Sequence, residues 1–345
     1  MHSNKHIVWV VPGFASSEKD DTCIPTLLDL LNHIKKNTDI KVSIIALQYP
    51  FSNEPYQIFG STVYPMNGKN KWWNKASVWK KSLNKLKDLD TEHPIHCMHS
   101  FWLGDTTLIA EAFSKQKKIK CICTLMGQDA LTENRNIKNS RLANTYTIAL
   151  TEIQAETFYR SSGRKVNEII PFGTPEFGFE AAEKKFDIIG VGSLIPLKNY
   201  EMWVEIIGLA KGKVPNLKTL LIGDGEQKAE LNRLIQKNGL ESTITLAGEK
   251  SREETLRLID QSKIFLHTSK YEGQGYVLTE AMSRKLAMLS TPVGYALENE
   301  KIWKGTSPQD FADEIAHLLR KPDLRVSYKF MQMKDVWEKY KQFYL

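Results

Sequence analysis

The sequence predicts an α/β protein made of two doubly wound parallel-sheet domains. Its 345 residues are long for a single hydrophobic core and natural for two. Short apolar runs rich in β-branched residues alternate with segments of helical periodicity, and repeated β-α units of this length form parallel sheets. Residues 171–175 contain two prolines and a glycine, which is typical of a linker. We therefore expect one domain over residues 1–172 and another over residues 173–327.

The first half of the chain shows strand and helix patterns in alternation. His99 lies near the carboxyl end of one expected strand, where ligands of open α/β sheets gather, and is therefore a candidate site residue. The alternative is a structural role, which is more common for a lone histidine. Strands are expected at residues 6–11, 41–48, 95–100, 119–125, 146–150 and 166–170, and helices at residues 24–34, 107–113 and 151–159.

Residues 69–87 form a basic and aromatic segment. One interpretation is an amphipathic helix docked on the sheet. The other is a helix whose lysines and exposed tryptophans contact an anionic membrane surface, with Trp73 lying off the main apolar stripe. The expected apolar face carries Trp72, Ala76, Trp79, Leu83 and Leu86.

The second half alternates more regularly between the two patterns. Ser251 and Glu254 have the spacing of a capping box at the start of a helix that runs to Ile259. Residues 327–345 carry aromatic side chains at helical spacing. Strands are expected at residues 186–191, 217–222, 244–247 and 263–269, and further helices at residues 200–210, 227–234, 276–286 and 308–320.

The composition indicates a folded globular protein, with 41% hydrophobic and 10% aromatic residues. The longest N-terminal apolar run, residues 7–12, is too short for a signal peptide or a membrane span. The four cysteines show no metal-like spacing. A reducing cytoplasm is the simplest expected location.

The net charge of +7 is concentrated in the first half. Residues 1–172 contain 22 Lys and Arg against 16 Asp and Glu, whereas residues 173–345 contain 25 against 24. Such an excess favours an anionic acceptor, an anionic membrane surface or nucleic acid, or is simply a solvated surface. Because no nucleic-acid-binding module or base-stacking pattern accompanies the charge, we expect no nucleic-acid partner.

A glycine-rich loop joins the strand at residues 263–269 to the helix that follows. Gly273 and Gly275 let the backbone bend and approach a ligand closely, and the start of the helix favours an anion. Glu272 lies in the loop and Glu280 in the second helical turn, so both carboxylates can face one pocket. The alternative is a solvated loop with two surface acids, because a Gly-x-Gly by itself is a weak signal.

The sequence of this loop and helix, YEGQGYVLTEAM, resembles the Glu-x(7)-Glu signature of retaining glycosyltransferases of the GT-B fold, especially family 4, the glycosyl transferases group 1. The resemblance implies that Glu272 contacts the donor sugar and that Glu280 binds the nucleotide ribose. Backbone amides after the first glutamate would also contact the donor, at Gly273, Gln274 and Gly275. Gln274 is in addition a candidate for donor selection.

Two further loops of the second half resemble segments of that family. Residues 192–199 resemble the family's segment Gly-Arg-Leu-x-x-x-Lys-Gly, whose Arg and Lys bind the donor diphosphate. Lys198 matches the lysine, and Ser193 stands in place of the arginine. The Gly-Asp-Gly sequence from Gly223 to Gly225 resembles the family's turn beside the nucleotide.

The first half resembles the family in outline. The resemblance places Gly13, in the loop after the first strand, beside the donor phosphates. It also implies that His99 lies in the cleft beside the donor sugar. Relatives often carry His-Gly-x-Asp where this chain has Met126 followed by Gly-Gln-Asp, so no histidine role is carried over there.

The fold implied by the resemblance is GT-B, with two Rossmann-like domains facing across a cleft. Residues 1–172 would bind the acceptor, and residues 173–327 the nucleotide-sugar. The last helix, residues 328–345, would return to the N-terminal domain.

The implied activity is that of a retaining glycosyltransferase in cell-surface polysaccharide synthesis. It would move a hexose-type sugar from a UDP- or GDP-sugar to a glycan or lipid-linked acceptor, with no metal or other cofactor. The expected catalytic residues are His99, Lys198 and Glu272. The enzyme would act in the cytoplasm, with peripheral contact to the inner face of the membrane through residues 69–87 as one alternative. Other functions left open are a different GT-B activity such as nucleotide-sugar epimerisation, and a catalytically impaired nucleotide-binding protein.

Overall fold

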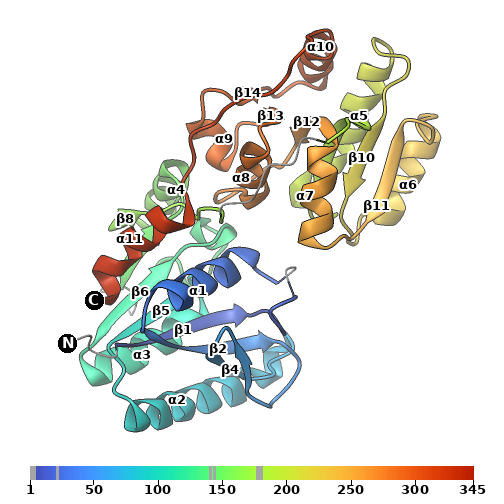
Figure 1. Ribbon diagram of the computed structural model, residues 1–345. Helices are drawn as coiled ribbons and strands as arrows, with labels where there is room; N and C mark the ends of the chain where they lie inside the picture. The colour runs from blue at the N-terminus through green and yellow to red at the C-terminus, as the bar shows by residue number, and fades with distance from the viewer. Residues whose placement is uncertain (1–4, 21–22, 140–141, 143–144, 176–181) are drawn as a thin grey trace. The chain divides into compact units, whose positions relative to one another are not determined.

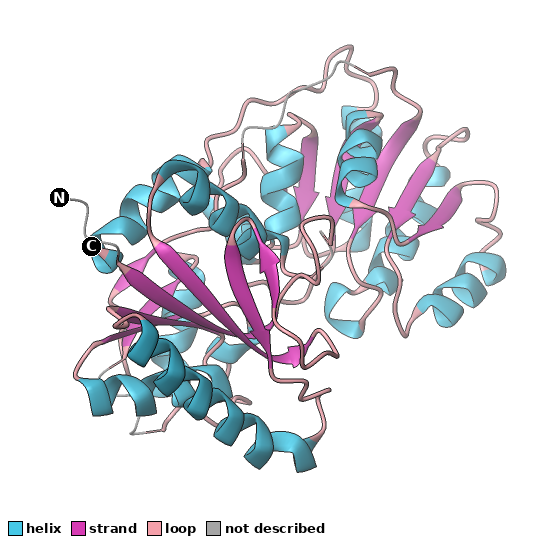
Figure 2. Ribbon diagram, turned by 60° about the horizontal axis from the view of Figure 1, so that its bottom comes forward, coloured by secondary structure: helices cyan, strands magenta, loops and turns pink. Residues whose placement is uncertain are grey.

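The structure, a computed structural model, describes residues 5–20, 23–139, 142, 145–175 and 182–345. The chain divides into two compact units, which we call the first unit (Met1–Pro175 and Met331–Leu345) and the second unit (Glu176–Phe330). Each unit is a sheet with helices on both of its faces (Figures 1 and 2). The boundaries expected from the sequence, at residues 172 and 327, lie close to those of the units.

The sheet of the first unit has eight strands in the order β3-β4-β2-β1-β5-β6-β7-β8. Neighbouring strands are parallel except for the edge pair β3 and β4. This edge hairpin, whose two strands are only three and five residues long, was not predicted from the sequence. The strands are β1 (His6–Gly13), β2 (Lys41–Tyr49), β3 (Tyr56–Ile58), β4 (Ser61–Pro65), β5 (Cys97–Phe101), β6 (Lys120–Thr124), β7 (Tyr146–Ala149) and β8 (Glu168–Ile169).

Five α-helices cover the described part of this sheet. The apolar stripe predicted for residues 69–87 is partly wrong, because Trp72 lies in a short 3-10 turn before α2 and is 82% exposed. The buried residues of α2 are instead Val78, Ser82, Leu86 and Leu89. The helices are α1 (Pro25–Asn37), α2 (Lys75–Glu92), α3 (Asp105–Lys117), α4 (Glu152–Ser162) and α11 (Met333–Tyr344).

The last helix, α11, belongs to the first unit, where it lies beside α1 (Figure 1). Its Trp337, Tyr340 and Tyr344 are buried, and the Tyr344 hydroxyl accepts a hydrogen bond from Nε1 of Trp9 at 3.1 Å. The aromatic spacing at the end of the sequence therefore reflects core packing. The predicted return of the final helix to the N-terminal domain is confirmed.

The second unit contains a six-stranded sheet in the order β11-β10-β9-β12-β13-β14, with all neighbouring strands parallel. Its strands are β9 (Phe186–Val191), β10 (Thr219–Ile222), β11 (Ile244–Gly248), β12 (Ser262–His267), β13 (Ala287–Ser290) and β14 (Trp303–Lys304). Its helices are α5 (Tyr200–Lys211), α6 (Lys228–Lys237), α7 (Arg252–Asp260), α8 (Tyr276–Ser283), α9 (Gly294–Glu298) and α10 (Pro308–Leu318).

Both faces of this second sheet are buried. Ile188 of β9 packs into one apolar cluster, with residues of α5, α6 and α10, while the next residue, Ile189, packs into another with residues of α7 and α8. Successive strand side chains point to opposite faces, so a sheet covered on both sides requires continuous apolar runs. This requirement explains why the short apolar runs in the sequence predicted the strands correctly.

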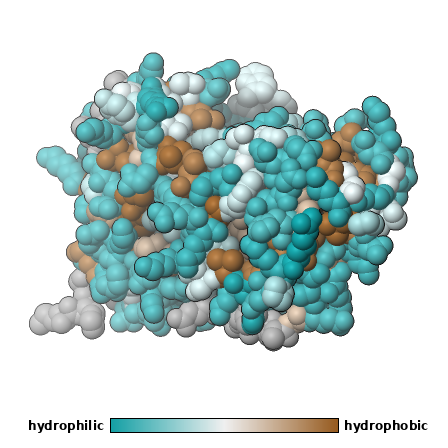
Figure 3. Space-filling view, turned by 90° about the horizontal axis from the view of Figure 1, so that it is seen from above, coloured by the Kyte–Doolittle hydropathy of each residue, from teal (hydrophilic) through white to brown (hydrophobic). Residues whose placement is uncertain are grey.

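The surface is mostly hydrophilic on the face shown in Figure 3, with apolar side chains in smaller groups between the hydrophilic ones. Among the described residues, no helix has both the length and the apolar character needed to cross a membrane.

Candidate functional site

The carboxyl edge of the second-unit sheet brings two predicted loops together. Strand order reverses about β9, since β10 pairs with one of its edges and β12 with the other. The loops after β9 and β12 are joined by a hydrogen bond from Oγ1 of Thr268 to the carbonyl of Lys198 at 3.0 Å, and by another from the Lys270 amide to the carbonyl of Leu197 at 2.8 Å. Ligands of doubly wound sheets bind at such a reversal point.

An ion pair between Lys198 and Glu272 lies at the centre of this edge. Nζ of Lys198 is 2.5 Å from Oε1 of Glu272, and the two side chains are only 19% and 11% exposed. Oγ of Ser269 donates a 2.8 Å hydrogen bond to the same carboxylate oxygen. Nε2 of His267 lies 3.2 Å from that oxygen. Two residues predicted from separate motifs are thus in direct contact.

These neighbours determine the charge of the carboxyl group. Burial alone would raise the pKa of Glu272, but the nearby His267 and Lys198 lower it to about 2. Glu272 is therefore ionised at neutral pH. Tyr200 has a raised pKa because it is buried and close to the Glu272 charge. The site consequently presents a fixed carboxylate beside an amine.

Glu280, the second predicted carboxylate, is held by Arg252, which no sequence motif indicates. Oε1 of Glu280 accepts a 2.7 Å hydrogen bond from Nε of Arg252, and both side chains are nearly buried. Nη2 of Arg252 also donates to the hydroxyl of Tyr276 at 3.0 Å. Arg252 begins α7 directly after Ser251, whose side chain accepts from the Glu254 amide as predicted for a helix cap. The sequence therefore predicted Ser251 as the capping residue, but not the contact between Arg252 and Glu280.

The glycines of the second predicted turn allow close backbone packing. Gly223 has a φ of 143°, and a Cβ atom there would lie 1.9 Å from the carbonyl oxygen of Gly192. A Cβ atom at Gly225 would lie 2.5 Å from the carbonyl oxygen of Leu194. Any other residue would therefore push the two loops apart. The structure thus brings Gly223 and Gly225 against the loop that carries the exposed Ser193.

The loop before α8 is also tightly fixed. Gly275 caps the helix with a φ of 78°, in the left-handed region that glycine favours. The side chain of Gln274 is buried and donates from Nε2 to Oγ1 of Thr279 at 3.3 Å. A Cβ atom at Gly294, at the start of α9, would lie 2.6 Å from the carbonyl oxygen of Gln274. The hydrogen bond to Thr279 gives the Gln274 side chain a role in holding the loop. Its predicted backbone contact with the donor, like that of Gly273, stays a prediction.

The structure contradicts the catalytic role predicted for His99. Its side chain is completely buried in the first unit, between β5 and α11. Nδ1 lies 2.5 Å from the Tyr344 hydroxyl and Nε2 lies 2.9 Å from Oγ1 of Thr124. Burial lowers the pKa of His99 to about 3, so the ring is neutral at physiological pH. A buried ring with both nitrogens engaged cannot contact a sugar, and His99 is a core residue.

Gly13 also has a packing role in the first unit. It ends β1, and a Cβ atom there would lie 3.3 Å from Cβ of Tyr49. Its predicted place beside the donor phosphates stays a prediction.

His267, and not His99, is the histidine at a strand end that lies beside a predicted site residue. It is the last residue of β12, at the carboxyl edge of the second-unit sheet, and it approaches Glu272. Ligands of open α/β sheets gather at the carboxyl ends of strands. This principle applies equally to His99 and His267, since both lie at the ends of short apolar runs. Sequence position alone did not distinguish the two side chains.

Comparison with known proteins supports a glycosyltransferase fold. Residues 175–330 match the model of the family glycosyl transferases group 1. The poly(ribitol-phosphate) alpha-N-acetylglucosaminyltransferase of Staphylococcus aureus (strain COL) is 25% identical over 167 residues, which cover 44% of this chain and 32% of that enzyme. This chain therefore spans about a third of the length of that relative.

Solved structures extend the similarity to the first unit. A mutant of S. aureus TarM, crystallised with fondaparinux, alpha-GlcNAc-glycerol and UDP, aligns over 77% of this chain and 59% of that chain, with a TM-score of 0.65 and 18% identity. Another crystal structure of TarM aligns over 99% of both chains, with a TM-score of 0.76 and 12% identity. These likenesses confirm the predicted GT-B fold, with its two parallel-sheet domains.

Proposed function

We propose that this chain, whose residues 175–330 match the model of the glycosyl transferases group 1, is a retaining glycosyltransferase that uses a nucleotide-sugar donor. The observation that carries the proposal is the nearly buried Lys198–Glu272 pair at the strand-order reversal of the second unit, with Glu280 on the helix that follows. The acceptor would be a glycan or a lipid-linked sugar of the cell surface. A relative named as acting on poly(ribitol-phosphate) supports an acceptor of this kind.

The proposed mechanism assigns one task to each charged group. Lys198 would bind the donor diphosphate and neutralise the negative charge that develops there as the bond to the sugar breaks. Glu272 would accept hydrogen bonds from donor sugar hydroxyls, because it is ionised and fixed by Ser269. Glu280, oriented by Arg252, would bind the ribose hydroxyls. Leaving-group stabilisation would thus come from protein groups, and we propose no bound metal or other cofactor.

The second candidate is a nucleotide-binding protein of the same fold with impaired catalysis. It is favoured by Ser193, which replaces the arginine expected in the diphosphate loop and supplies no charge there. Losing a bidentate cation weakens phosphate neutralisation. This candidate predicts nucleotide binding without turnover of any donor.

A thermal-shift panel with UDP, GDP, ADP, CMP, UDP-glucose, UDP-GlcNAc and GDP-mannose tests both candidates. We expect one nucleotide family to stabilise the protein selectively, since a ligand at about 100 times its Kd adds roughly 2.7 kcal/mol to the free energy of unfolding. Donor hydrolysis or transfer with the stabilising nucleotide-sugar would support the enzyme. Stabilisation without turnover would support the impaired protein, and stabilisation by none of the seven ligands would contradict both.

The acceptor side of the proposal includes contact with an anionic membrane surface through residues 69–87. Trp72 and Trp73 are 82% and 61% exposed and lie edge to face, with ring centroids 5.9 Å apart. Nζ of Lys71 lies 5.4 Å from the centre of the Trp73 ring. Exposed tryptophans next to lysines are the composition of membrane-surface segments.

Replacing Trp72 and Trp73 together by alanine should weaken binding to anionic vesicles at least about tenfold, because burying one large apolar side chain is worth roughly 1.5–3 kcal/mol. The measurement is co-sedimentation with vesicles that contain phosphatidylserine. Phe51→Ala is the matched control, since Phe51 is a 61% exposed aromatic residue of the same unit outside the segment. Equal binding of the double variant and the wild type would rule out this surface.

A further inference from the structure

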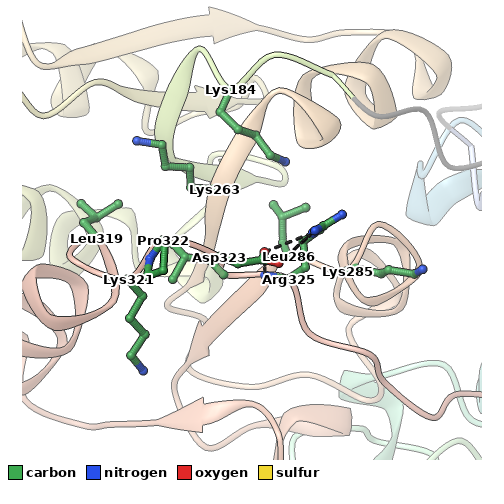
Figure 4. A pocket seen from close by; sticks show the side chains of 10 residues that line it. Lys184, Lys263, Lys285, Leu286, Leu319, Lys321, Pro322, Asp323 and Arg325 are labelled. Carbon is green, nitrogen blue, oxygen red and sulfur yellow. Dashed lines mark hydrogen bonds and ion pairs between the residues drawn. The ribbon is translucent and has the colours of Figure 1, made fainter.

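A second cationic site lies at the amino edge of the second-unit sheet, where its strands begin, opposite the carboxyl edge that carries Lys198 and Glu272. It is a pocket of about 270 Å³, which we call the amino-edge pocket (Figure 4). Five basic side chains line this amino-edge pocket, and Asp323 is its only acidic lining residue among those described. Its apolar lining is formed by Leu286, Leu319, Pro322 and Leu324, and its basic lining by Lys184, Lys263, Lys285, Lys321 and Arg325.

Strand register places this pocket far from the Lys198–Glu272 pair. Lys184 precedes β9, Lys263 is the second residue of β12 and Lys285 precedes β13. Phe186 pairs with Ser262 and Ile264 pairs with Ala287, so the three strands begin side by side. The candidate donor site lies beyond the other ends of the same strands. At about 3.3 Å per residue, the length of β12 separates the two sites by roughly 20 Å.

Two cations of the pocket keep N–H groups that no described residue accepts. Nζ of Lys184 is held by the carbonyl oxygens of Asp260 and Ser262, both at 2.8 Å, and an ammonium with three donors keeps one N–H for another partner. Nε and Nη2 of Arg325 donate hydrogen bonds to the two carboxylate oxygens of Asp323. Within the described part of the chain, Nη1 of Arg325 has no hydrogen-bond partner.

The charged ends of Lys184 and Arg325 lie toward each other in Figure 4, whereas Lys285 and Lys321 extend outward. Burial lowers the pKa of Lys184, Asp260 opposes this effect, and the positive charge of Arg325 adds to it. The two cations therefore repel each other across the pocket. A bound anion would remove this repulsion.

We propose that the amino-edge pocket binds a phosphate dianion, carried by free phosphate or by a small phosphate monoester. Lys184 and Arg325 would hold the phosphate oxygens, whereas Lys263 pairs with Asp187 and completes the lining. The apolar lining would receive the carbon body of a monoester. Arg325 and Lys321 lie on the segment that leads from α10 to Met331, where the chain re-enters the first unit. The ligand would therefore fix this connecting segment, independently of the donor site.

The test is calorimetric titration of the full chain with inorganic phosphate and, separately, with glucose 6-phosphate. Arg325→Gln should weaken binding at least about tenfold, the usual loss for a charge-assisted hydrogen bond. Its side chain is exposed, so the fold should be preserved, and an unchanged melting temperature checks this. Tighter binding of glucose 6-phosphate than of phosphate would identify a monoester ligand, and equal affinity would identify free phosphate.

Two control variants make the result specific. Arg233→Gln removes an exposed arginine that pairs with Glu230 elsewhere in the second unit, and it should bind phosphate like the wild type. Lys198→Ala removes the proposed diphosphate ligand of the donor site and should leave unchanged the phosphate binding that depends on Arg325. The proposal is overturned if neither ligand binds, if Arg325→Gln binds as tightly as the wild type, or if Lys198→Ala abolishes binding. The last result would place the phosphate at the donor site.

Discussion

The Lys198→Ala variant should lose about 10²- to 10³-fold in kcat with the nucleotide-sugar that the wild type uses, because it removes the one cation proposed to stabilise the departing diphosphate. Nζ of Lys198 already lies 2.5 Å from Glu272 in a site whose side chains are mostly shielded from water. Electrostatic stabilisation is strong in such surroundings. With Ser193 in the place of the expected arginine, no second cation of that loop can compensate. Steady-state transfer kinetics at saturating acceptor measure the loss.

Interpretation of this variant requires a stability control. Lys198 also neutralises the nearly buried Glu272, so its removal should lower the melting temperature, and the assay must run well below that temperature. Lys213→Ala is the matched control, because Lys213 pairs with Asp313 at 2.8 Å on the surface of the same unit. Its kcat should stay at the wild-type value. If Lys198→Ala remained fully active while folded, the diphosphate role of Lys198 would be wrong.

The strands of the second unit could be predicted from sequence because both faces of its sheet are buried. Each strand then appears as an uninterrupted apolar run, as at β9 and β12. The edge hairpin formed by β3 and β4 gave no such signal, since edge strands are short and partly exposed. Trp72 does not lie on the predicted apolar stripe because α2 begins only at Lys75, so helical spacing does not extend to residue 72.

The candidate site depends on contacts between residues that are distant in the sequence. The motifs selected Lys198 and Glu272, but not their contact, which depends on how two loops separated by more than seventy residues meet. His99, which was proposed from the sequence, and His267, which was not considered, differ in packing partners that are distant in sequence. His99 faces Tyr344 of the returning helix, whereas His267 faces Glu272. Both histidines are buried, so a position at the end of a strand identifies candidates, and only the surrounding side chains show which one contacts a predicted site residue.

Acid should remove a specific contribution of Glu272 to stability. The pKa of Glu272 is about 2 in the folded protein against a reference value of 4.5. Because the folded-state value is the lower one, the stabilisation is fully present above about pH 4.5 and disappears as the pH falls through about 2. The shift corresponds to about 3 kcal/mol. The free energy of unfolding of the wild type, relative to Glu272→Gln, should therefore fall by roughly 2 kcal/mol between pH 6 and pH 3.

Urea unfolding of the wild type and of Glu272→Gln at several pH values between 6 and 3 measures this difference in the free energy of unfolding. Subtracting one free energy from the other cancels the titration of ionisable groups that the two proteins share. Glu241→Gln, at an exposed carboxylate of the same unit, is the control and should show a nearly constant difference from the wild type. A flat difference for Glu272→Gln would mean that Glu272 is not held as a buried carboxylate by Lys198 and His267. The proposed donor site would then lack its fixed negative charge. A difference that narrows only below about pH 4.5 would instead show that His267 and Lys198 already hold Glu272 as a carboxylate before any donor binds.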